Sequence, residues 1–490
     1  MSVRIAAAWA LGSQYTSFAI QFAASVVLAR WFIDPAELGL FSIAFAAVSL
    51  VAFLQDFGVN RYITGERELT DEKLHTAFTV SILFAWSIAG LALLLAAPIA
   101  WFFDDPRLLP ITLVIAASYL LVPLAIVPQA LRQRALDYRS NTLIEVGAAL
   151  ANAAVAVTLA WQGYGALALA WGAFAQQAAR LVVSQWCAGL VLPWPLRLNG
   201  ARPVLEIGAT NSALAVAGAL IARSPELVIG RLIGAAATGL FARGAGLALQ
   251  LRLLVAGAVT GVFYPAFRQV RDSGAPLGPP YLRVVAAYTA VTWAAMAGIA
   301  VLAEPLVRLL YGAKWVEAAP LLTWLALAQC CYVALPLASD LPLLLGRKTA
   351  LVRRTAVDTA VSIVLLAVAA PFGLLAVAIS RLVHGLAQIA IYWGMMRAML
   401  GYAPRDLVAI QLRSALATLA AVAPALALYR LWDGPAQAGA AQIGASALAG
   451  GLAWLVALRL LRHSAFAEIT GLAAQLLGPL VARNKAPATS

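Results

Sequence analysis

Five arginines stand inside long apolar stretches of this sequence: Arg223, Arg231, Arg243, Arg252 and Arg381. If those stretches cross a membrane, each ionisable group costs about 2.5–3.5 kcal/mol on insertion scales, so it faces the protein interior and marks a functional site. A guanidinium suits an anionic ligand, because its fork binds phosphate oxygens in pairs and it does not deprotonate. Arg252, nearest the middle of its stretch, is the first candidate, and Arg243 and Arg381 join it. For Arg223 and Arg231, snorkelling to the interface is the expected role.

Two stripes of polar residues follow helical spacing. Arg381 is followed by His384 and Gln388, three and seven residues later, and Gln14 is followed by Gln21 and Ser25, at spacings of seven and four. Side chains at these spacings share one face of a helix. The first stripe predicts the lining of a ligand cavity, and the second suits the hydroxyl groups of a neutral ligand. The alternative for both is a hydrogen-bonded contact between helices.

Three carboxylates in apolar stretches are candidates for ion coupling. Glu145 shares a helix face with Asn152, Asp340 lies on the same side as Gln329, and Asp358 lies in the next stretch. A carboxyl group at membrane depth binds a proton or a sodium ion, because burial favours its neutral form. The alternative is a fixed ion pair with an arginine, which the basic run at 347–354 favours for Asp358.

The elements that carry these residues are long and apolar. Of 490 residues, 63% are hydrophobic and 11% are charged, whereas soluble domains carry roughly 25% charge. A soluble fold of this composition would expose large apolar patches, so the composition and the mean hydropathy of +0.87 predict an all-α integral membrane protein. Runs of about 20 apolar residues suffice to span a bilayer. Fourteen such runs are predicted, at 7–29, 38–60, 77–102, 108–131, 141–161, 164–186, 206–229, 237–266, 284–304, 318–345, 355–371, 374–397, 408–430 and 439–461.

The distribution of charge and the cysteine content further define this membrane protein, its topology and its partners. The net charge is +13, and the basic residues concentrate in alternate connectors, as the positive-inside rule requires. This pattern predicts that both termini are cytoplasmic, and it explains the basic excess without nucleic acid as a partner. The first run is too long for a cleaved signal peptide and is expected to be a retained transmembrane helix. The three cysteines form no disulfide framework or metal spacing.

Tryptophans near the ends of predicted spans indicate an interfacial belt. Trp293 and Trp324 lie deeper and are the two to test for stacking on a ligand. The six tryptophans near span ends are Trp31, Trp101, Trp186, Trp194, Trp315 and Trp432.

An internal repeat is indicated about 200 residues apart. LARWFIDPAELGLF at 28–41 and IGRLIGAAATGLF at 229–241 share an arginine and a Gly-Leu-Phe at nearly the same spacing. Parallel repeats of this kind are found in transporters. We therefore predict two six-helix lobes, 1–200 and 201–400, followed at 401–490 by a C-terminal helix pair and a cytoplasmic interfacial tail.

Six segments in this order resemble a known family, the polysaccharide-export flippases of the multidrug/oligosaccharidyl-lipid/polysaccharide exporter superfamily. The similarity is to the branch that handles O-antigen, exopolysaccharide and colanic-acid repeat units. The segments are LARWFIDPAELGLF at 28–41, LQDFGVNRYI at 54–63, VIGRLIGAAATGLF at 228–241, VFYPAFRQVRD at 262–272, LVRLLYGAKWVEAAPLL at 306–322 and LLLGRK at 343–348.

The resemblance implies a transporter of the bacterial inner membrane. Its substrate would be an undecaprenyl-diphosphate-linked oligosaccharide, moved by alternating access from the cytoplasmic to the outer leaflet for polysaccharide or lipopolysaccharide biosynthesis. The arginines would bind the diphosphate, and His384, Gln388 and Gln21 would line the same diphosphate and sugar cavity, with Gln21 suited to sugar hydroxyls. Membrane lipid, a polysaccharide polymerase and chain-length proteins are the implied partners, and no cofactor or metal is implied.

Two other functions are alternatives for a membrane protein of this kind. A membrane glycosyltransferase, polymerase or ligase acting on the same lipid needs a catalytic motif in a sizeable outer loop. The one outer carboxylate pair, Asp104-Asp105, precedes Pro106 in an ordinary turn, so we predict that the chain is not an enzyme. Drug efflux on the same fold calls for an acidic and aromatic cavity, against the arginine excess seen here. No phosphate-binding GxxxxGK[ST] loop is present.

Overall fold

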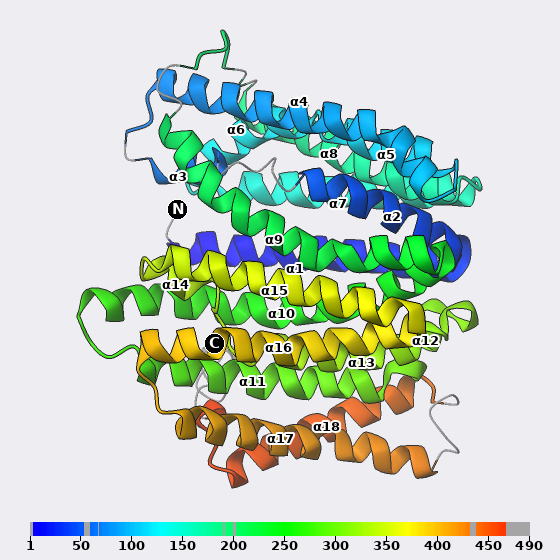
Figure 1. Ribbon diagram of the computed structural model, residues 1–490, viewed down its shortest axis with the longest axis vertical. Coiled ribbons are helices and arrows are strands. Elements are labelled where there is room, and N and C mark those ends of the chain that lie inside the picture. The colour runs from blue at the N-terminus through cyan, green and yellow to red at the C-terminus, as the bar shows by residue number, and fades with distance from the viewer. Residues whose placement is uncertain are drawn as a thin grey trace, which may run out of the picture. The chain divides into compact units, whose positions relative to one another are not determined.

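The computed structural model is helical throughout the part of the chain that it describes, with no strand among those residues (Figure 1). The described residues are 3–52, 59–66, 68–189, 191, 193–198, 202–431 and 438–466. The chain forms two compact units. Unit 1 comprises Met1–Ala242, Leu310–Trp315 and Ser362–Val377, and unit 2 comprises Arg243–Leu309, Val316–Val361 and Ala378–Ser490. The lobe boundaries at 200 and 400 stay a prediction.

The helices of the first half of the chain fall in unit 1. They are α1 (Val3–Val27), α2 (Pro35–Ala52), α3 (Val59–Gly65), α4 (Asp71–Phe102), α5 (Leu108–Ser118), α6 (Val122–Arg134), α7 (Tyr138–Trp161), α8 (Ala166–Ala188) and α9 (Arg202–Leu232). A π-helical turn, Leu28–Phe32, continues α1.

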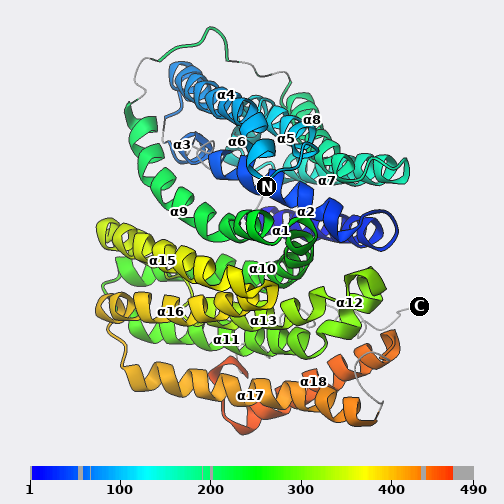
Figure 2. The ribbon, with the colours of Figure 1, turned by 45° about the vertical axis from the view of Figure 1, so that its right-hand side comes forward.

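The helix α10 (Ala235–Asp272) begins in unit 1 and continues into unit 2. The helices that follow are α11 (Gly278–Val301), α12 (Ala303–Tyr311), α13 (Ala318–Tyr332), α14 (Asp340–Leu344), α15 (Lys348–Ala369), α16 (Leu374–Leu400), α17 (Pro404–Leu431) and α18 (Ala440–Leu460). In both ribbon views α15 lies beside α16, and α17 beside α18 (Figure 2).

The prediction of an all-helical membrane protein is confirmed. Ten helical segments of the described chain are long and apolar enough to cross a membrane. They cover ten of the fourteen predicted spans, and α1, α9, α10 and α13 occupy the other four. The count of fourteen spans stays a prediction.

One predicted span is broken in two. The range 318–345 contains α13, an irregular segment and the short α14. Pro336 lies in the break, where a proline removes a backbone donor and cannot continue a helix, and Leu337 next to it has φ of 59°. Asp340 is exposed at the start of α14, so the predicted common face with Gln329 on one helix does not exist.

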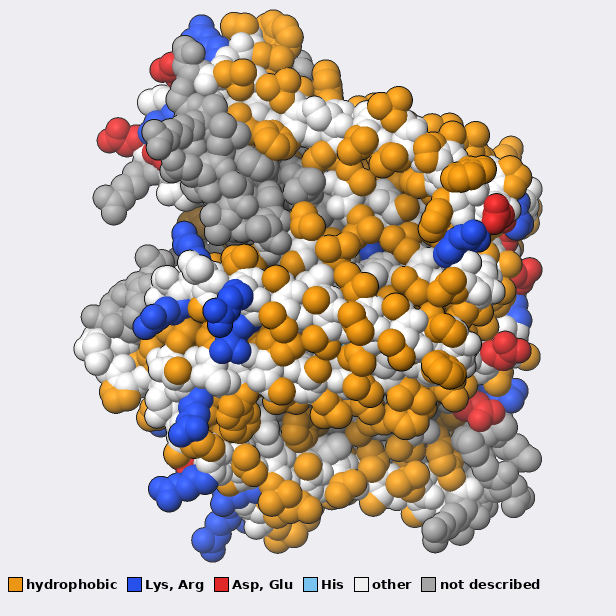
Figure 3. Space-filling model, in the orientation of Figure 1, with side chains coloured by type: hydrophobic (Ala, Val, Ile, Leu, Met, Phe, Trp, Pro, Cys, Tyr) orange, Lys and Arg blue, Asp and Glu red, His pale blue; other side chains and the backbone are white. Residues whose placement is uncertain are grey.

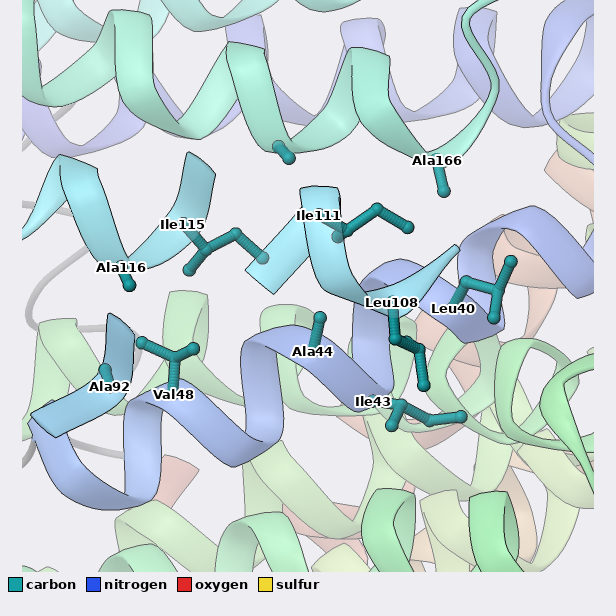
Figure 4. Packing of buried hydrophobic residues seen from close by; sticks show 11 residues of the cluster. Leu40, Ile43, Ala44, Val48, Ala92, Leu108, Ile111, Ile115, Ala116 and Ala166 are labelled. Carbon is teal, nitrogen blue, oxygen red and sulfur yellow. The ribbon is translucent and has the colours of Figure 1, made fainter. Parts of the chain in front are cut away.

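The core of unit 1 is packed around small residues. Leu40, Ile43 and Val48 of α2 meet Leu108 and Ile111 of α5, with helices α4 and α8 completing the cluster (Figure 4). Because lipid is as apolar as these side chains, such a core is held by close van der Waals contact rather than by the hydrophobic effect. Alanines provide the close approach, at Ala44, Ala92, Ala116, Ala166 and Ala170.

The beginnings of α2 and α10 touch through their backbones. A Cβ atom on Gly39 would lie 1.7 Å from the carbonyl oxygen of Ala235, and one on Gly239 would lie 1.8 Å from that of Pro35. No residue with a side chain fits either position without moving the helices apart. The two glycines are the ones shared by the similar segments at 28–41 and 228–241, so the contact is reciprocal. This supports the repeat, which stays a prediction.

Two polar contacts of unit 1 lie at the end of the helices where this crossing lies, here called the Asp34 end. Lys314 Nζ lies 3.0 Å from Asp34 Oδ1. The indole of Trp315 is fully buried and donates to the carbonyl oxygen of Ala29 at 2.8 Å. The prediction that Trp315 belongs to an interfacial belt is therefore wrong, because the 310–315 turn folds back into the protein. Trp31, Trp101, Trp186 and Trp194 are exposed as predicted, and Trp432 lies outside the described residues.

In unit 2, a buried hydrogen-bonded chain joins α11, α17 and the turn after α18. The His463 Nδ1 accepts from the backbone N–H of Ala465 at 3.2 Å, and His463 Nε2 lies 3.0 Å from the Ser414 hydroxyl. That hydroxyl lies 2.9 Å from the hydroxyl of Thr289. Because Nδ1 is an acceptor, the imidazole is neutral and its Nε2–H donates to Ser414. Burial, and secondly the charge of Arg413, lower the pKa of His463.

The surface of each unit is consistent with a bilayer environment. Hydrophobic side chains cover the lengths of the helices seen in Figure 3, and charged side chains gather near the helix ends. Large exposed apolar residues are frequent on α17 and α18, including Leu412, Leu419, Leu448 and Leu452. Exposed residues of this kind face lipid in a membrane protein, where no water opposes them.

Candidate functional site: a buried polar cluster in unit 2

Four side chains from three helices form a hydrogen-bonded cluster inside unit 2. His384 of α16 lies with Nε2 2.9 Å from Asp358 Oδ1 of α15 and with Nδ1 3.0 Å from the hydroxyl of Tyr332 of α13. Gln388 Nε2 donates to Asp358 Oδ2 at 3.2 Å, and the Tyr332 hydroxyl donates to the carbonyl oxygen of Arg381 at 3.0 Å. His384 is 0% exposed and Asp358 2%. Each polar group of the cluster therefore depends on the others for its hydrogen bonds.

The helix spacing of α16 builds one side of this cluster. Arg381, His384 and Gln388 share a face, as predicted, and Arg381 is only 5% exposed. Gly385 lets α13 approach closely, because a Cβ atom there would lie 2.6 Å from Cβ of Cys331. The close approach brings Tyr332 within reach of His384.

Arg252 extends the cluster from α10. Its guanidinium and that of Arg381 both act electrostatically on the Tyr332 phenol, as Asp358 does. Arg252 also acts on the phenol of Tyr288 in α11. The Nε of Arg252 is buried and donates to no acceptor in the described part of the chain. Two guanidinium groups and the carboxylate of Asp358 are thus near enough to the Tyr332 phenol to act on it electrostatically.

A separate polar group lies in unit 1. Glu145 of α7 accepts from Arg180 of α8 at 2.9 Å and from Gln129 of α6 at 2.8 Å. Arg180 also donates to Gln177 at 2.9 Å. Arg180 lies eight residues before the end of α8 and is not among the intramembrane arginines named from the sequence. Its position within the predicted span 164–186 is the signal that identifies it. Glu145, a candidate for ion coupling, is thus paired with an arginine.

The remaining candidates lie elsewhere. Gln21 is exposed on α1 in unit 1, away from the unit 2 cluster. Arg243 is half-buried near the start of α10. Arg223 stacks on Phe45 at 5.0 Å. Arg231 pairs with Asp104 at 3.2 Å at the Asp34 end, as expected for a structural arginine near a helix end.

Trp293 donates its indole N–H to the carbonyl oxygen of Cys330 at 2.8 Å. Among the described residues no group of three metal-ligating side chains occurs.

Helices long enough to span a membrane, with a charged cluster buried among them, define an integral membrane protein with a polar site inside its helical bundle. The chain matches a family model described as polysaccharide biosynthesis protein over residues 27–320. The chain belongs to this family, and the resemblance drawn from its sequence is confirmed.

Two curated relatives are bacterial. The chain is 24% identical over 298 residues to the lipopolysaccharide biosynthesis protein WzxC of Escherichia coli K12, covering 60% of each chain. It is 25% identical to the succinoglycan biosynthesis transport protein ExoT of Rhizobium meliloti, covering 69% of this chain and 68% of that one. The alignment with the first relative therefore spans less than two thirds of its length.

Solved structures share the fold. The lipid II flippase MurJ in an inward closed conformation matches with a TM-score of 0.72 and 12% identity, over 96% of this chain and 98% of that one. An inward-facing multidrug resistance MATE family transporter matches with a TM-score of 0.59 and 16% identity, over 79% of this chain and 95% of that one. At these identities the likeness establishes the fold alone.

Proposed function

We propose that the chain is a flippase that moves undecaprenyl-diphosphate-linked oligosaccharide repeat units from the cytoplasmic to the outer leaflet of a bacterial inner membrane. The observation that carries the proposal is the buried hydrogen-bonded cluster of unit 2, where His384 bonds Asp358 and Tyr332 and shares a helix face with Arg381, which is 5% exposed. The half-buried Arg252 also acts on the Tyr332 phenol. Guanidinium groups held inside a helical bundle favour an anionic ligand. In a family of polysaccharide biosynthesis proteins, a diphosphate attached to a glycan is the anion that fits.

The names of the relatives support this reading. One is a lipopolysaccharide biosynthesis protein and another a succinoglycan transport protein, and the fold is shared with a lipid II flippase. In our proposal the arginines replace the hydration of the diphosphate during its passage, while the lipid tail stays in the bilayer. Alternation of access between the two leaflets completes the cycle.

The orientation follows from the distribution of basic residues. Arg347 precedes α15, and Lys348, Arg353 and Arg354 lie in its first two turns. By the positive-inside rule this basic end of α15 is cytoplasmic. The same rule, applied to the alternate basic connectors of the sequence, leads us to propose that both termini are cytoplasmic.

A leaflet-resolved glycan assay tests the function. In cells that lack the protein, lipid-linked oligosaccharide should accumulate where a membrane-impermeant glycosidase added to right-side-out vesicles cannot cleave it. The Arg252→Ala variant should lower export about 10- to 100-fold, since a hydrogen bond to a charged group contributes about 1.5–3 kcal/mol. Arg252→Lys should restore export in part, because lysine keeps the charge but not the fork.

Arg405→Ala is the matched control, because the Arg405 side chain is 90% exposed beside Asp406. It should export at the normal rate. Complete cleavage of the oligosaccharide in cells lacking the protein would show that translocation occurs without it, and would remove the proposal.

A further inference from the structure

We propose that Asp358 and His384 form a site that holds one exchangeable proton, and that occupancy of this site is linked to the binding of the diphosphate. The linkage rests on the proposed function, whereas the proton site itself rests on the hydrogen bonds of unit 2 alone. His384 and Gln388 are predicted from the sequence to line the substrate cavity, and the hydrogen bonds of the cluster point to this further role.

The argument for the proton begins at Tyr332. Its hydroxyl lies 3.0 Å from the carbonyl oxygen of Arg381 and 3.0 Å from His384 Nδ1. A carbonyl oxygen is only an acceptor, and two oxygens at this distance repel each other unless a hydrogen lies between them. The single hydroxyl hydrogen therefore points to Arg381, and Nδ1 of His384 must carry a hydrogen to donate to Tyr332.

The other side of the imidazole fixes the proton count. His384 Nε2 lies 2.9 Å from Asp358 Oδ1, so one hydrogen lies between these atoms as well. It belongs either to an imidazolium facing a carboxylate or to a carboxylic acid facing a neutral imidazole. Both descriptions contain one proton more than a neutral histidine beside a carboxylate. Gln388 donates to the other oxygen, Oδ2, at 3.2 Å and is satisfied in either case.

Loss of that proton changes a specific contact. The neutral imidazole would keep its hydrogen on Nε2, facing the Asp358 carboxylate. Its Nδ1 would then become an acceptor, and the Tyr332 hydroxyl would turn towards it. The hydrogen bond from Tyr332 to the Arg381 carbonyl would be lost, and the link between α13 and α16 beside the Arg381 guanidinium would weaken.

The charges around the pair give the linkage its sign. Arg252 from α10 and Arg381 from α16 act on the same Tyr332 phenol as Asp358 does, and their positive charge opposes an added proton. A diphosphate that neutralises them would remove this opposition, so the proton and the anion should each strengthen the binding of the other. The other titratable or charged groups that act on this region are Cys331 of α13, Arg354 of α15 and Tyr392 of α16.

Nitrogen NMR of the full-length protein labelled with ¹⁵N-histidine tests the proton site directly. The chain has three histidines, so His384→Gln assigns the relevant signals, and His75→Gln and His463→Gln are matched controls. We expect His384 to carry a hydrogen on Nδ1. An unprotonated Nδ1 at neutral pH would overturn the site, whatever the protein transports.

Farnesyl diphosphate serves as the probe for linkage. Saturating probe should raise the fraction of His384 that carries a hydrogen on Nδ1, because each ligand strengthens the binding of the other. In Asp358→Asn the probe should no longer change this fraction. If the probe binds to the unchanged protein without changing the fraction, the linkage is wrong and the proton site stands. If the probe does not bind, the linkage fails together with the diphosphate assignment, while the NMR result still decides the proton site.

Discussion

The crossing of α2 and α10 predicts a large effect from a very small substitution. In Gly39→Ala, the added Cβ would start 1.7 Å from the carbonyl oxygen of Ala235, so the two helices must move apart by more than an ångström. Overpacking of this kind costs about 1–3 kcal/mol. Replacing glycine by alanine within a helix otherwise stabilises it by about 1 kcal/mol. The cost of separating the two helices must therefore exceed this gain for the variant to be less stable.

Gly90→Ala on α4 provides the matched control, because a Cβ atom there meets nothing within 4 Å. The thermal unfolding midpoint of Gly39→Ala in nanodiscs should fall, while that of Gly90→Ala should stay or rise. A result in which the two variants behave alike would refute the reasoning, because it would mean that the backbones do not touch at Gly39.

A second measurement reads the crossing itself. Cysteines replacing Asp34 and Lys314, whose ion pair closes the Asp34 end at 3.0 Å, can be joined by a short bis-thiol reagent once Cys187, Cys330 and Cys331 are replaced. The added Cβ of Gly39→Ala destabilises the closed crossing by about 1–3 kcal/mol. In a protein that exchanges between open and closed forms, the ratio of open to closed molecules should therefore rise about 5- to 150-fold. Cross-linking should fall accordingly in Gly39→Ala and not in Gly90→Ala.

Three further predictions concern stability. Trp315→Phe leaves a buried carbonyl without its donor and should lower stability by about 1–3 kcal/mol in thermal unfolding, whereas Trp101→Phe, at an exposed site, should have little effect. Glu145→Gln leaves the half-buried charge of Arg180 without its carboxylate and should destabilise by about 1–2 kcal/mol, with a fall in unfolding midpoint that Arg180→Gln in the same chain partly reverses. Because burial lowers the pKa of His463, its contribution is present above the ordinary histidine pKa of about 6.5 and is lost as the pH falls through the folded value. A midpoint that falls as strongly with acid in His463→Gln as in the unchanged protein would contradict this.

The helical period predicted the cluster only in part. Arg381, His384 and Gln388 lie on one face because the spacing of a single helix decides it. Their partners Asp358 and Tyr332 come from α15 and α13, and which faces of these helices meet α16 depends on packing that no spacing within one helix encodes.

Two errors have local physical causes. Trp315 was assigned to the interface because it lies beside a span end, yet the 310–315 turn buries it against Ala29. Asp340 was assigned to a continuous helix because its neighbours are apolar, yet Pro336 interrupts that helix. In both places the apolar composition correctly predicts a membrane-spanning region, but it carries no information on the backbone turn within or beside it.

The contact at Gly239 lies near one end of the long helix α10. From Gly239 to the end of α10 at Asp272, at 1.5 Å per residue, the helix extends about 50 Å. If α10 rotated about this contact by about 10°, its far end would move through about 9 Å. A small rotation at the crossing would thus become a much larger displacement at the far end of this helix.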